Sequence, residues 1–580
     1  MMGISRYAWL GLLLLTLLSY FQFPGNTYLE SDTQIYLPMF ERFRDPSLLA
    51  RDPMVVRAHT SFTLYDELTA GLAWLGGLDF EPVLRALHLA ARLALLAGVF
   101  LITRAMGLSE LPAFACAGVY GLGGWVYGPS VLLVEYEPVP RALALGPLLL
   151  GVGLAAHERY LASGVAGAAA FLLHPTTAAP FWIVYVARLF VPDEPAVMKA
   201  RLQALAPLAA AVVGLKIAAS LQPGVTEPQA FFGRLDAAWE KLVRLRASYV
   251  YVSLWPRLYF WQYGLMLVAA AAAYCRLRRF LQPGLRFYLA GLAALGLASL
   301  PLSYLFLERL EWAMMPQLQP LRAILFLELF TMLLALVMAF ELGCREGKWI
   351  AAGWWAAAGF AVGLYPRLLF VLLPPAIGWL AGGPWRALGA AAAAGLAAAQ
   401  PFGLIVWRGA GRSNLLLALG LGALLAAASA LWLRRPKLGA AAMVALTSLA
   451  FFLIPGSLRR PRAVPELDQL ARWARATAPR DAVFLFPEAG RGSDPSVFRA
   501  RSARAVYADW KGGGQINFFR EFPGLWWSRW TETMERPFHA GRLTRFRELG
   551  IDYVVLNAQT PPPGGRLVFE NSRYRVYDLR

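Results

Sequence analysis

The sequence predicts a polytopic α-helical membrane protein with a small C-terminal α/β domain outside the membrane. Of its 580 residues, 58% are hydrophobic and only 16% are charged, whereas a soluble domain averages about 25% charged residues. Apolar stretches of about 17–25 residues, the length that spans a bilayer as a helix, recur from the N-terminus to about residue 455. These two features exclude a soluble enzyme, a disordered chain and a fibrous protein.

We expect about 15 transmembrane helices in this apolar part. The first is expected to remain uncleaved, because no small-x-small cleavage site follows it. The predicted spans are 8–22, 84–105, 110–128, 141–156, 161–174, 178–191, 203–220, 259–275, 286–307, 321–341, 349–364, 367–381, 387–407, 414–433 and 438–455.

The distribution of positive charge sets the predicted orientation. Three loops between the predicted spans are strongly basic, namely 276–279, 345–348 and 434–437. Basic loops lie on the cytoplasmic side. This places the N-terminus inside, and the long first loop (23–80) and the tail outside. We therefore predict a transmembrane domain over 1–457 and a soluble extracytoplasmic α/β domain over 458–580.

The net charge of +19 is spread over short loops and the tail. Scattered charge of this kind suits topology and contact with anionic membrane lipids, and we expect no nucleic-acid partner. The three cysteines, Cys116, Cys275 and Cys344, lie in or beside predicted spans. The tail therefore has neither a disulfide framework nor a cysteine zinc site.

The tail has the patterning of a small α/β unit. We expect helices over 465–477 and 543–549, buried strands over 482–486 and 551–556, and a final hairpin over 566–579. Its Asp509–Gly514 turn is rich in glycine and contains Lys511, but it lacks the spacing of a P-loop. The aromatic run Trp526–Trp530 suits sugar stacking, the membrane interface or simple packing onto the membrane domain.

Two carboxylates open the first outer loop. Glu30 and Asp32 follow the first helix at a spacing of two residues, which suits a general base or a divalent cation. Two carboxylates at close range raise the pKa of one of them. The alternative is structural, because Asp32 also suits a cap for a helix over 33–43.

Further polar residues follow in the same loop, and we expect most of them to be solvated. They are Asp45, Arg51, Asp52, Arg57 and His59. A long polar loop so early in a membrane protein still favours a functional role, because long ordered loops tend to carry function.

Glu135, Glu137 and Arg141 lie at the outer rim of a span, where prolines interrupt the helix. Prolines leave backbone groups that a cavity or other protein must satisfy. The two glutamates suit a cation or a basic substrate group, or they anchor the chain at the interface.

His174 and Arg322 also lie near the outer leaflet. His174 precedes a proline between two short apolar halves, which suits a cavity wall or a plain hairpin turn. The guanidinium of Arg322 suits a phosphate or diphosphate, or it extends to the interface.

The sequence contains no HExxH, no Walker motif, no Gly-x-Ser-x-Gly and no Cys/His cluster. These absences argue against a metalloprotease, an ATP-driven pump and an α/β-hydrolase.

The arrangement as a whole resembles the GT-C superfamily of integral-membrane glycosyltransferases. Protein O-mannosyltransferases and the lipid A aminoarabinose transferase are examples, and a large bacterial branch is more similar still. The resemblance is clearest over about the first 190 residues. The segments that carry it are 32–36, 48–53, 135–141, 174–175 and 509–511.

The resemblance implies a polyprenyl-phosphate-linked sugar as donor, an acceptor of unnamed class, and a site on the outer side of the bacterial inner membrane. It implies Asp32 as general base with Glu30 as its partner, and it leaves a divalent cation open. The substrate-binding residues implied or suggested are Tyr36, Arg57, His59, Glu135, Glu137, Arg141, His174, Arg322 and Lys511.

Two features depart from the family patterns. Protein mannosyltransferases carry adjacent Asp-Glu, whereas this chain has Glu-x-Asp. Oligosaccharyltransferases carry Trp-Trp-Asp-Tyr-Gly, whereas Ser528-Arg529 follows Trp526-Trp527 here, which argues against peptide-asparagine glycosylation.

Two other functions fit the same composition. A transporter or flippase for a lipid or glycan predicts charged residues at mid-membrane and helix breaks in both halves. A non-catalytic scaffold predicts carboxylates and basic groups that lie apart.

Overall fold

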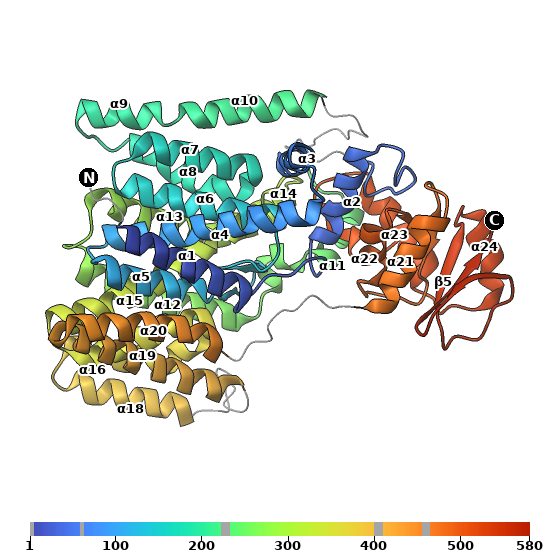
Figure 1. Ribbon diagram of the computed structural model, residues 1–580. Coiled ribbons are helices and arrows are strands. Elements are labelled where there is room, and N and C mark those ends of the chain that lie inside the picture. Colours follow the sequence, from blue (N-terminus) through green and yellow to red (C-terminus); the bar gives the residue numbers. More distant parts are fainter. Residues whose placement is uncertain (1–4, 58–62, 222–232, 399–409, 455–463) are drawn as a thin grey trace.

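The computed structural model describes residues 5–57, 63–221, 233–398, 410–454 and 464–580. A bundle of apolar helices forms one end of the molecule, and the C-terminal region (residues 464–580) forms the other (Figure 1). The predicted domain boundary at 457/458 lies outside the described residues. The chain is mostly helical, as predicted.

A helix overlaps each predicted span within the described ranges. These helices are α1 (Arg6–Phe21), α4 (Phe80–Ala105), α5 (Glu110–Gly121), α6 (Pro140–Ala156), α7 (Tyr160–Leu173), α8 (Pro175–Leu189), α10 (Ala206–Leu221), α12 (Arg257–Leu277), α13 (Pro283–Ser303), α15 (Leu325–Phe340), α16 (Trp349–Leu364), α17 (Leu369–Ala381), α18 (Trp385–Ala398), α19 (Ala410–Arg434) and α20 (Pro436–Leu453).

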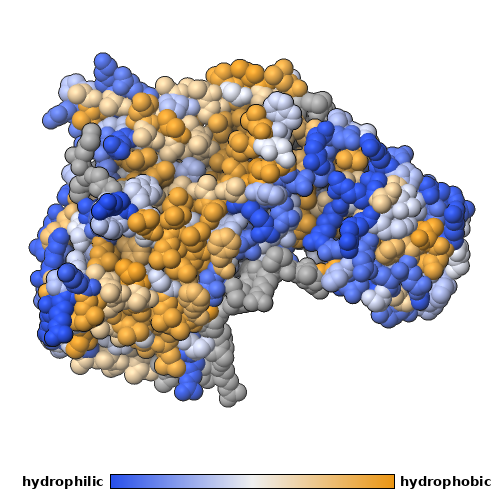
Figure 2. Space-filling view, viewed as in Figure 1, coloured by the Kyte–Doolittle hydropathy of each residue, from blue (hydrophilic) through white to orange (hydrophobic). Residues whose placement is uncertain are grey.

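Seven helical segments of the described chain are long and apolar enough to cross a membrane, and shorter apolar helices accompany them. Every side chain of α15 is buried, so this helix lies at the centre of the bundle. On the face shown in Figure 2, apolar residues cover most of the side of the bundle, whereas polar residues gather over the C-terminal region and at the opposite end of the bundle. The chain is therefore a multi-pass membrane protein.

Short helices lie between the bundle and the C-terminal region (Figure 1). They come from the predicted outer loops and include α2 (Thr33–Arg44), α3 (Tyr65–Gly76), α11 (Ala237–Arg246) and α14 (Met315–Leu318). The helix α9 (Pro195–Gln203) precedes α10, and a small hairpin pairs β1 (Trp125–Val126) with β2 (Val131–Leu132).

The C-terminal region contains a five-stranded mixed sheet in the order β4-β3-β5-β7-β6, in which β4, β3 and β5 are parallel. The helix predicted over 465–477 is α21. The elements are α21 (Pro465–Thr477), β3 (Val483–Leu485), α22 (Asp494–Ser502), β4 (Ala505–Val506), η8 (Gly512–Asn517), α23 (Phe522–Met534), α24 (Leu543–Glu548), β5 (Tyr553–Asn557), β6 (Arg566–Glu570) and β7 (Tyr574–Asp578).

The C-terminal region packs tightly on the outer loops. One apolar cluster includes Ile35 and Met54 of the first loop, Trp239 of α11, and Ile516 and Trp526 of the C-terminal region. Burial of apolar side chains is the main force that holds such a junction together. This packing brings residues from the two ends of the sequence to one site.

Candidate functional site

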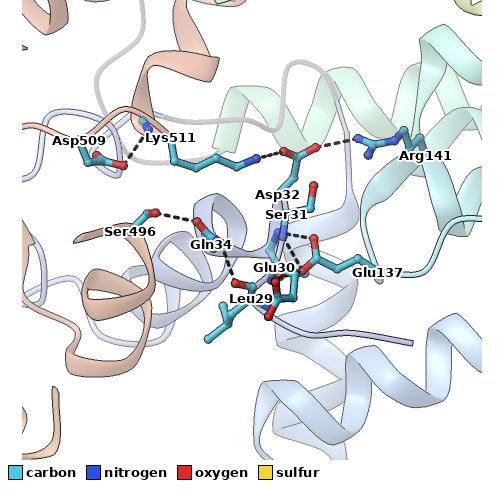
Figure 3. A network of polar contacts seen from close by, with 12 residues as sticks. Leu29, Glu30, Ser31, Asp32, Gln34, Glu137, Arg141, Ser496, Asp509 and Lys511 are labelled. Atoms are coloured by element: carbon cyan, nitrogen blue, oxygen red, sulfur yellow. Dashed lines mark hydrogen bonds and ion pairs between the residues drawn. The ribbon is translucent and has the colours of Figure 1, made fainter. Parts of the chain in front are cut away.

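A buried glutamate holds the turn that precedes α2. Glu137 is 1% exposed, and its carboxylate accepts hydrogen bonds from the backbone N–H groups of Glu30 (2.8 Å) and Ser31 (2.9 Å) and from the Thr33 hydroxyl (2.7 Å). Figure 3 shows Glu137 beneath this turn. In this structure Glu137 therefore shapes the loop that presents Asp32, rather than facing the cavity described below.

Asp32 lies between two cations that come from distant parts of the chain (Figure 3). One carboxylate oxygen is 2.7 Å from the guanidinium of Arg141, and the other is 2.7 Å from the ammonium of Lys511. Arg141 also pairs with Glu135 at 2.7 Å. Pro140 occupies the first position of α6, where its fixed φ favours helix initiation, and this places Arg141 beside Asp32.

The pKa of Asp32 is shifted down, whereas the sequence suggested that one pKa of the Glu30–Asp32 pair is raised. Burial alone raises the pKa of this carboxyl, but Lys511 and Arg141 outweigh burial and hold the pKa well below its usual range. The side chain of Glu30 is exposed, and cations rather than a second carboxylate dominate the surroundings of Asp32.

Asp32 lines a cavity of about 220 Å³, which we call the central cavity. The predicted residues Tyr36, Arg141, His174, Arg322 and Lys511 line it as well. Arg246 of α11 adds a fourth cation, so four positive side chains and one carboxylate face this space among the described residues. Such an excess of positive charge suits an anionic ligand.

Two of these arginines have no carboxylate partner within the described part of the chain. The Nε atoms of Arg322 and Arg246 are buried without a hydrogen-bond acceptor, and neither residue forms an ion pair there. Burial lowers the pKa of Arg246. Both side chains are half-buried, and the guanidinium of Arg246 lies over the ring of Trp510. Because neither cation is neutralised by a carboxylate of the described chain, both are suited to bind an anionic group of a ligand.

Two smaller cavities adjoin the central cavity. The inner cavity, of about 30 Å³, begins at Arg141 and Arg322 and continues between apolar side chains of α6, α8 and α15, namely Leu145, Pro180, Leu325 and Phe326. The side cavity, of about 150 Å³, shares His174 and Arg322 and is lined mainly by apolar atoms, including those of Met314 and Leu318. A charged centre with apolar extensions suits an amphipathic ligand.

His174 stands at the break between α7 and α8. Its Nδ1 accepts a hydrogen bond from the backbone N–H of Thr177 at 3.2 Å and so caps α8. It therefore has the structural role of a turn residue and also lines both the central and the side cavity.

Arg57 lies away from the central cavity. Its guanidinium lies over the ring of Phe522 and donates to the carbonyl of Pro53, and it is not among the residues that line the cavity. His59 lies outside the described residues. Glu135 reaches the inner cavity and contributes through its ion pair with Arg141.

A buried ionic network positions Lys511, and the sequence did not reveal it. Asp52 was expected to be solvated but is 0% exposed, and it pairs at 2.6 Å with Arg499, which is 2% exposed. Arg499 also pairs with Asp509, whose carboxylate accepts the N–H of Gly512 at 2.9 Å. We call Asp52, Arg499 and Asp509 the buried network. Its contacts hold the chain in place on both sides of Lys511.

The close packing of η8 on α23 explains why residue 513 is a glycine. A Cβ atom there would lie 2.4 Å from the ring of Trp526, so only glycine allows η8 to pack this closely on α23. This contact holds η8 at the wall of the central cavity.

The residues around Asp32 do not fit a divalent cation. Both oxygens of Asp32 already accept from cations, and no group of three His, Cys, Asp or Glu side chains suited to a metal occurs among the described residues.

A family model described as "Domain of unknown function (DUF6798)" matches residues 465–523, the part that carries Arg499, Asp509 and Lys511. No curated protein matches the chain.

Among solved structures, the chain is similar to ArnT from Cupriavidus metallidurans bound to undecaprenyl phosphate, with 13% identity, 99% of this chain and 97% of that chain covered, and a TM-score of 0.41. It is also similar to arabinofuranosyltransferase AftD from Mycobacteria, with 15% identity, 100% of this chain and 40% of that chain covered, and a TM-score of 0.44.

Proposed function

We propose that this protein is a membrane glycosyltransferase that moves a sugar from a polyprenyl-phosphate donor to an acceptor hydroxyl, with Asp32 as the general base. One observation carries the proposal. Asp32 lies between Arg141 and Lys511 in a cavity with an excess of cations, and this cavity continues into an apolar space between helices.

The charge pattern fits the donor. A guanidinium binds a phosphate through two parallel hydrogen bonds, and Arg141 and Arg322 line both the central and the inner cavity. A phosphate bound there has its lipid chain directed toward the apolar inner cavity. Its sugar then lies in the central cavity beside Asp32.

The transfer step needs a base, a leaving group and orientation. The acceptor hydroxyl oxygen bonds to the anomeric carbon of the sugar while the bond from that carbon to the phosphate oxygen breaks. Asp32 takes the hydroxyl proton, and polyprenyl phosphate leaves with the bonding electron pair. Arg141, Arg322 and Lys511 stabilise the charge that develops on the departing phosphate.

The same cations connect donor binding to the strength of the base. Without a ligand, Arg141 and Lys511 both pair with Asp32 and hold its pKa low, despite its burial, so the carboxylate is a weak base. An arriving phosphate competes for these two cations. We infer that this competition raises the pKa of Asp32 when the donor is bound, so that the base becomes effective only with donor present.

We further place the site on the extracytoplasmic side of the bacterial inner membrane. The three basic loops of the sequence favour about 15 spans and put residues 458–580 outside as a soluble α/β domain. A lipid-linked donor suits this side, because it needs no cytoplasmic nucleotide sugar.

The replacement Asp32→Asn tests the role of the base. Removing the base is expected to lower kcat by about 10²–10⁴-fold. Because the carboxylate no longer competes for Arg141 and Lys511, binding of undecaprenyl phosphate is expected to be at least as tight as in the unchanged protein. Transfer is measured in detergent or nanodiscs with radiolabelled lipid-linked sugars, and lipid phosphate binding by thermophoresis.

A matched control is Asp45→Asn. Asp45 lies in the same loop and pairs with Arg480 of the C-terminal region at 3.1 Å, but it does not line the central cavity. It is expected to keep transfer within about 2-fold. Full activity of Asp32→Asn would refute the assigned role.

The two other functions predict different outcomes. A scaffold would leave carboxylates and basic groups apart, and the grouping around Asp32 argues against it. A transporter would move a labelled lipid-linked sugar across a liposome membrane without forming a new glycosidic bond, and the same liposomes separate the two activities.

A further inference from the structure

Two buried amides face the central cavity without a hydrogen-bond partner. Gln319 is 5% exposed and Asn517 is 2% exposed, and both line the cavity. The side-chain oxygens Gln319 Oε1 and Asn517 Oδ1 have no partner in the described part of the chain. One residue precedes the 3₁₀ turn that carries Arg322, and the other ends η8.

A buried amide that lines a cavity and has an unpartnered atom is suited to bind a ligand. Burying such a polar atom without a hydrogen bond is unfavourable, so most buried polar atoms in proteins are paired. Amides offer both donors and acceptors, as do sugar hydroxyls. An anionic phosphate is suited instead to the cations of the same cavity.

The rest of the wall favours a neutral sugar ring. The aromatic side chains of Tyr36, Tyr249 and Phe518 line the same space, and an aromatic ring offers an apolar face against which a sugar ring can pack. The four cations there oppose a ligand that carries an ammonium group, because like charges repel.

We propose that Gln319 and Asn517 form the sugar subsite of the donor, and that the sugar is a neutral, hydroxyl-rich ring rather than a cationic amino sugar. This inference rests on the proposed function and specifies which part of the donor meets which wall. The lipid phosphate contacts the cations, and the sugar hydroxyls contact the two amides. Gln319 comes from the segment that leads into α15 of the bundle, and Asn517 comes from the C-terminal region.

The test compares lipid phosphates with and without a sugar. The probes are undecaprenyl phosphate, the same lipid phosphate carrying glucose, galactose, mannose or arabinofuranose, and one carrying 4-amino-4-deoxyarabinose. Dissociation constants are measured in nanodiscs. In the unchanged protein, at least one neutral sugar is expected to tighten binding by about 5- to 100-fold over the bare phosphate, and the amino sugar is expected not to tighten it.

The variants Gln319→Met and Asn517→Leu remove each amide at similar volume. Each is expected to lose most of the gain from the sugar while keeping undecaprenyl phosphate binding within about 2-fold, since the cations stay in place. The matched control is Gln262→Met. Gln262 of α12 is 1% exposed with an unpartnered side-chain nitrogen, but it does not line this cavity, so its replacement is expected to keep the gain.

Binding of bare undecaprenyl phosphate shows whether a variant is folded. Should Asn517→Leu lack it, Asn517→Ala, which only removes atoms, takes its place in the comparison. The proposal is overturned if no neutral sugar tightens binding, if the amino sugar binds best, or if both amide variants keep the full gain. Failure of the unchanged protein to bind any lipid phosphate would overturn the proposed function itself, and this inference with it.

Discussion

At the scale of single residues, the ion pair between Asp32 and Lys511 shows how a nearby cation lowers the pKa of a buried carboxyl. The pKa of Asp32 is lower in the folded protein than in the unfolded chain, where it is about 3.9. Its ion pairs therefore stabilise the fold above about pH 4, and this stabilisation is lost as the pH falls below that value.

We predict that Lys511→Met moves the acid limb of the pH profile of kcat/KM to higher pH. One of the two cations at Asp32 is then absent, so the pKa of the carboxyl rises toward its ordinary value. At pH 7 kcat/KM is expected to fall by about 10- to 100-fold, since a charged contact to the phosphate is also lost. Lys511→Arg keeps the charge and is expected to keep the acid limb near its original position. An unshifted limb in Lys511→Met would show that the ion pair does not control the base.

At the scale of structural elements, the buried network joins the first loop to α22 and η8. Arg499 pairs with Asp52 at 2.6 Å and also with Asp509. Removing one member of a buried ion pair leaves an uncompensated charge and costs about 3–5 kcal/mol. The network therefore contributes both to the packing of the C-terminal region and to the position of Lys511.

We predict that Arg499→Met lowers the thermal stability and also lowers kcat at temperatures where the protein remains folded, because Lys511 is no longer held toward Asp32. The control is Arg504→Met. Arg504 is equally buried in the same region but donates only to backbone carbonyls such as that of Ala478. It is expected to lower stability without a comparable loss of kcat. Equal losses of kcat in the two variants would show that the buried network has only a structural role.

The same elements show what the sequence could predict. The helices could be located because a span of about 20 apolar residues is a local signal, and the strands of the C-terminal region could be located from short apolar runs. Asp52 was predicted to be solvated because its partner Arg499 is 447 positions away. No local sequence pattern identifies Gln319, Asn517 or Arg246 as site residues either, since only the folded chain brings them to one cavity.

At the scale of the whole molecule, the arrangement requires two parts of the chain to meet on one side of the membrane. Lys511 of the C-terminal region is 479 positions from Asp32, and the central cavity has walls from both the outer loops and η8. The C-terminal region lies at the end of the molecule opposite the N-terminus (Figure 1). The proposed site therefore depends on the C-terminal region being outside the cell membrane.

We test this orientation with cysteines placed at two exposed positions. One is Pro562, between β5 and β6, and the other is Lys437, in the first turn of α20 within the basic segment 434–437. In a background with Cys275 and Cys344 replaced by serine and the fully buried Cys116 kept, Pro562→Cys is expected to react with a membrane-impermeant maleimide in intact spheroplasts. Lys437→Cys is expected to react only after permeabilisation, because basic loops stay in the cytoplasm. The background alone measures reaction at Cys116 and sets the baseline. Labelling of Lys437→Cys but not of Pro562→Cys in intact spheroplasts would show that the topology is inverted. The site would then face the cytoplasm and would no longer suit a donor used on the outer side.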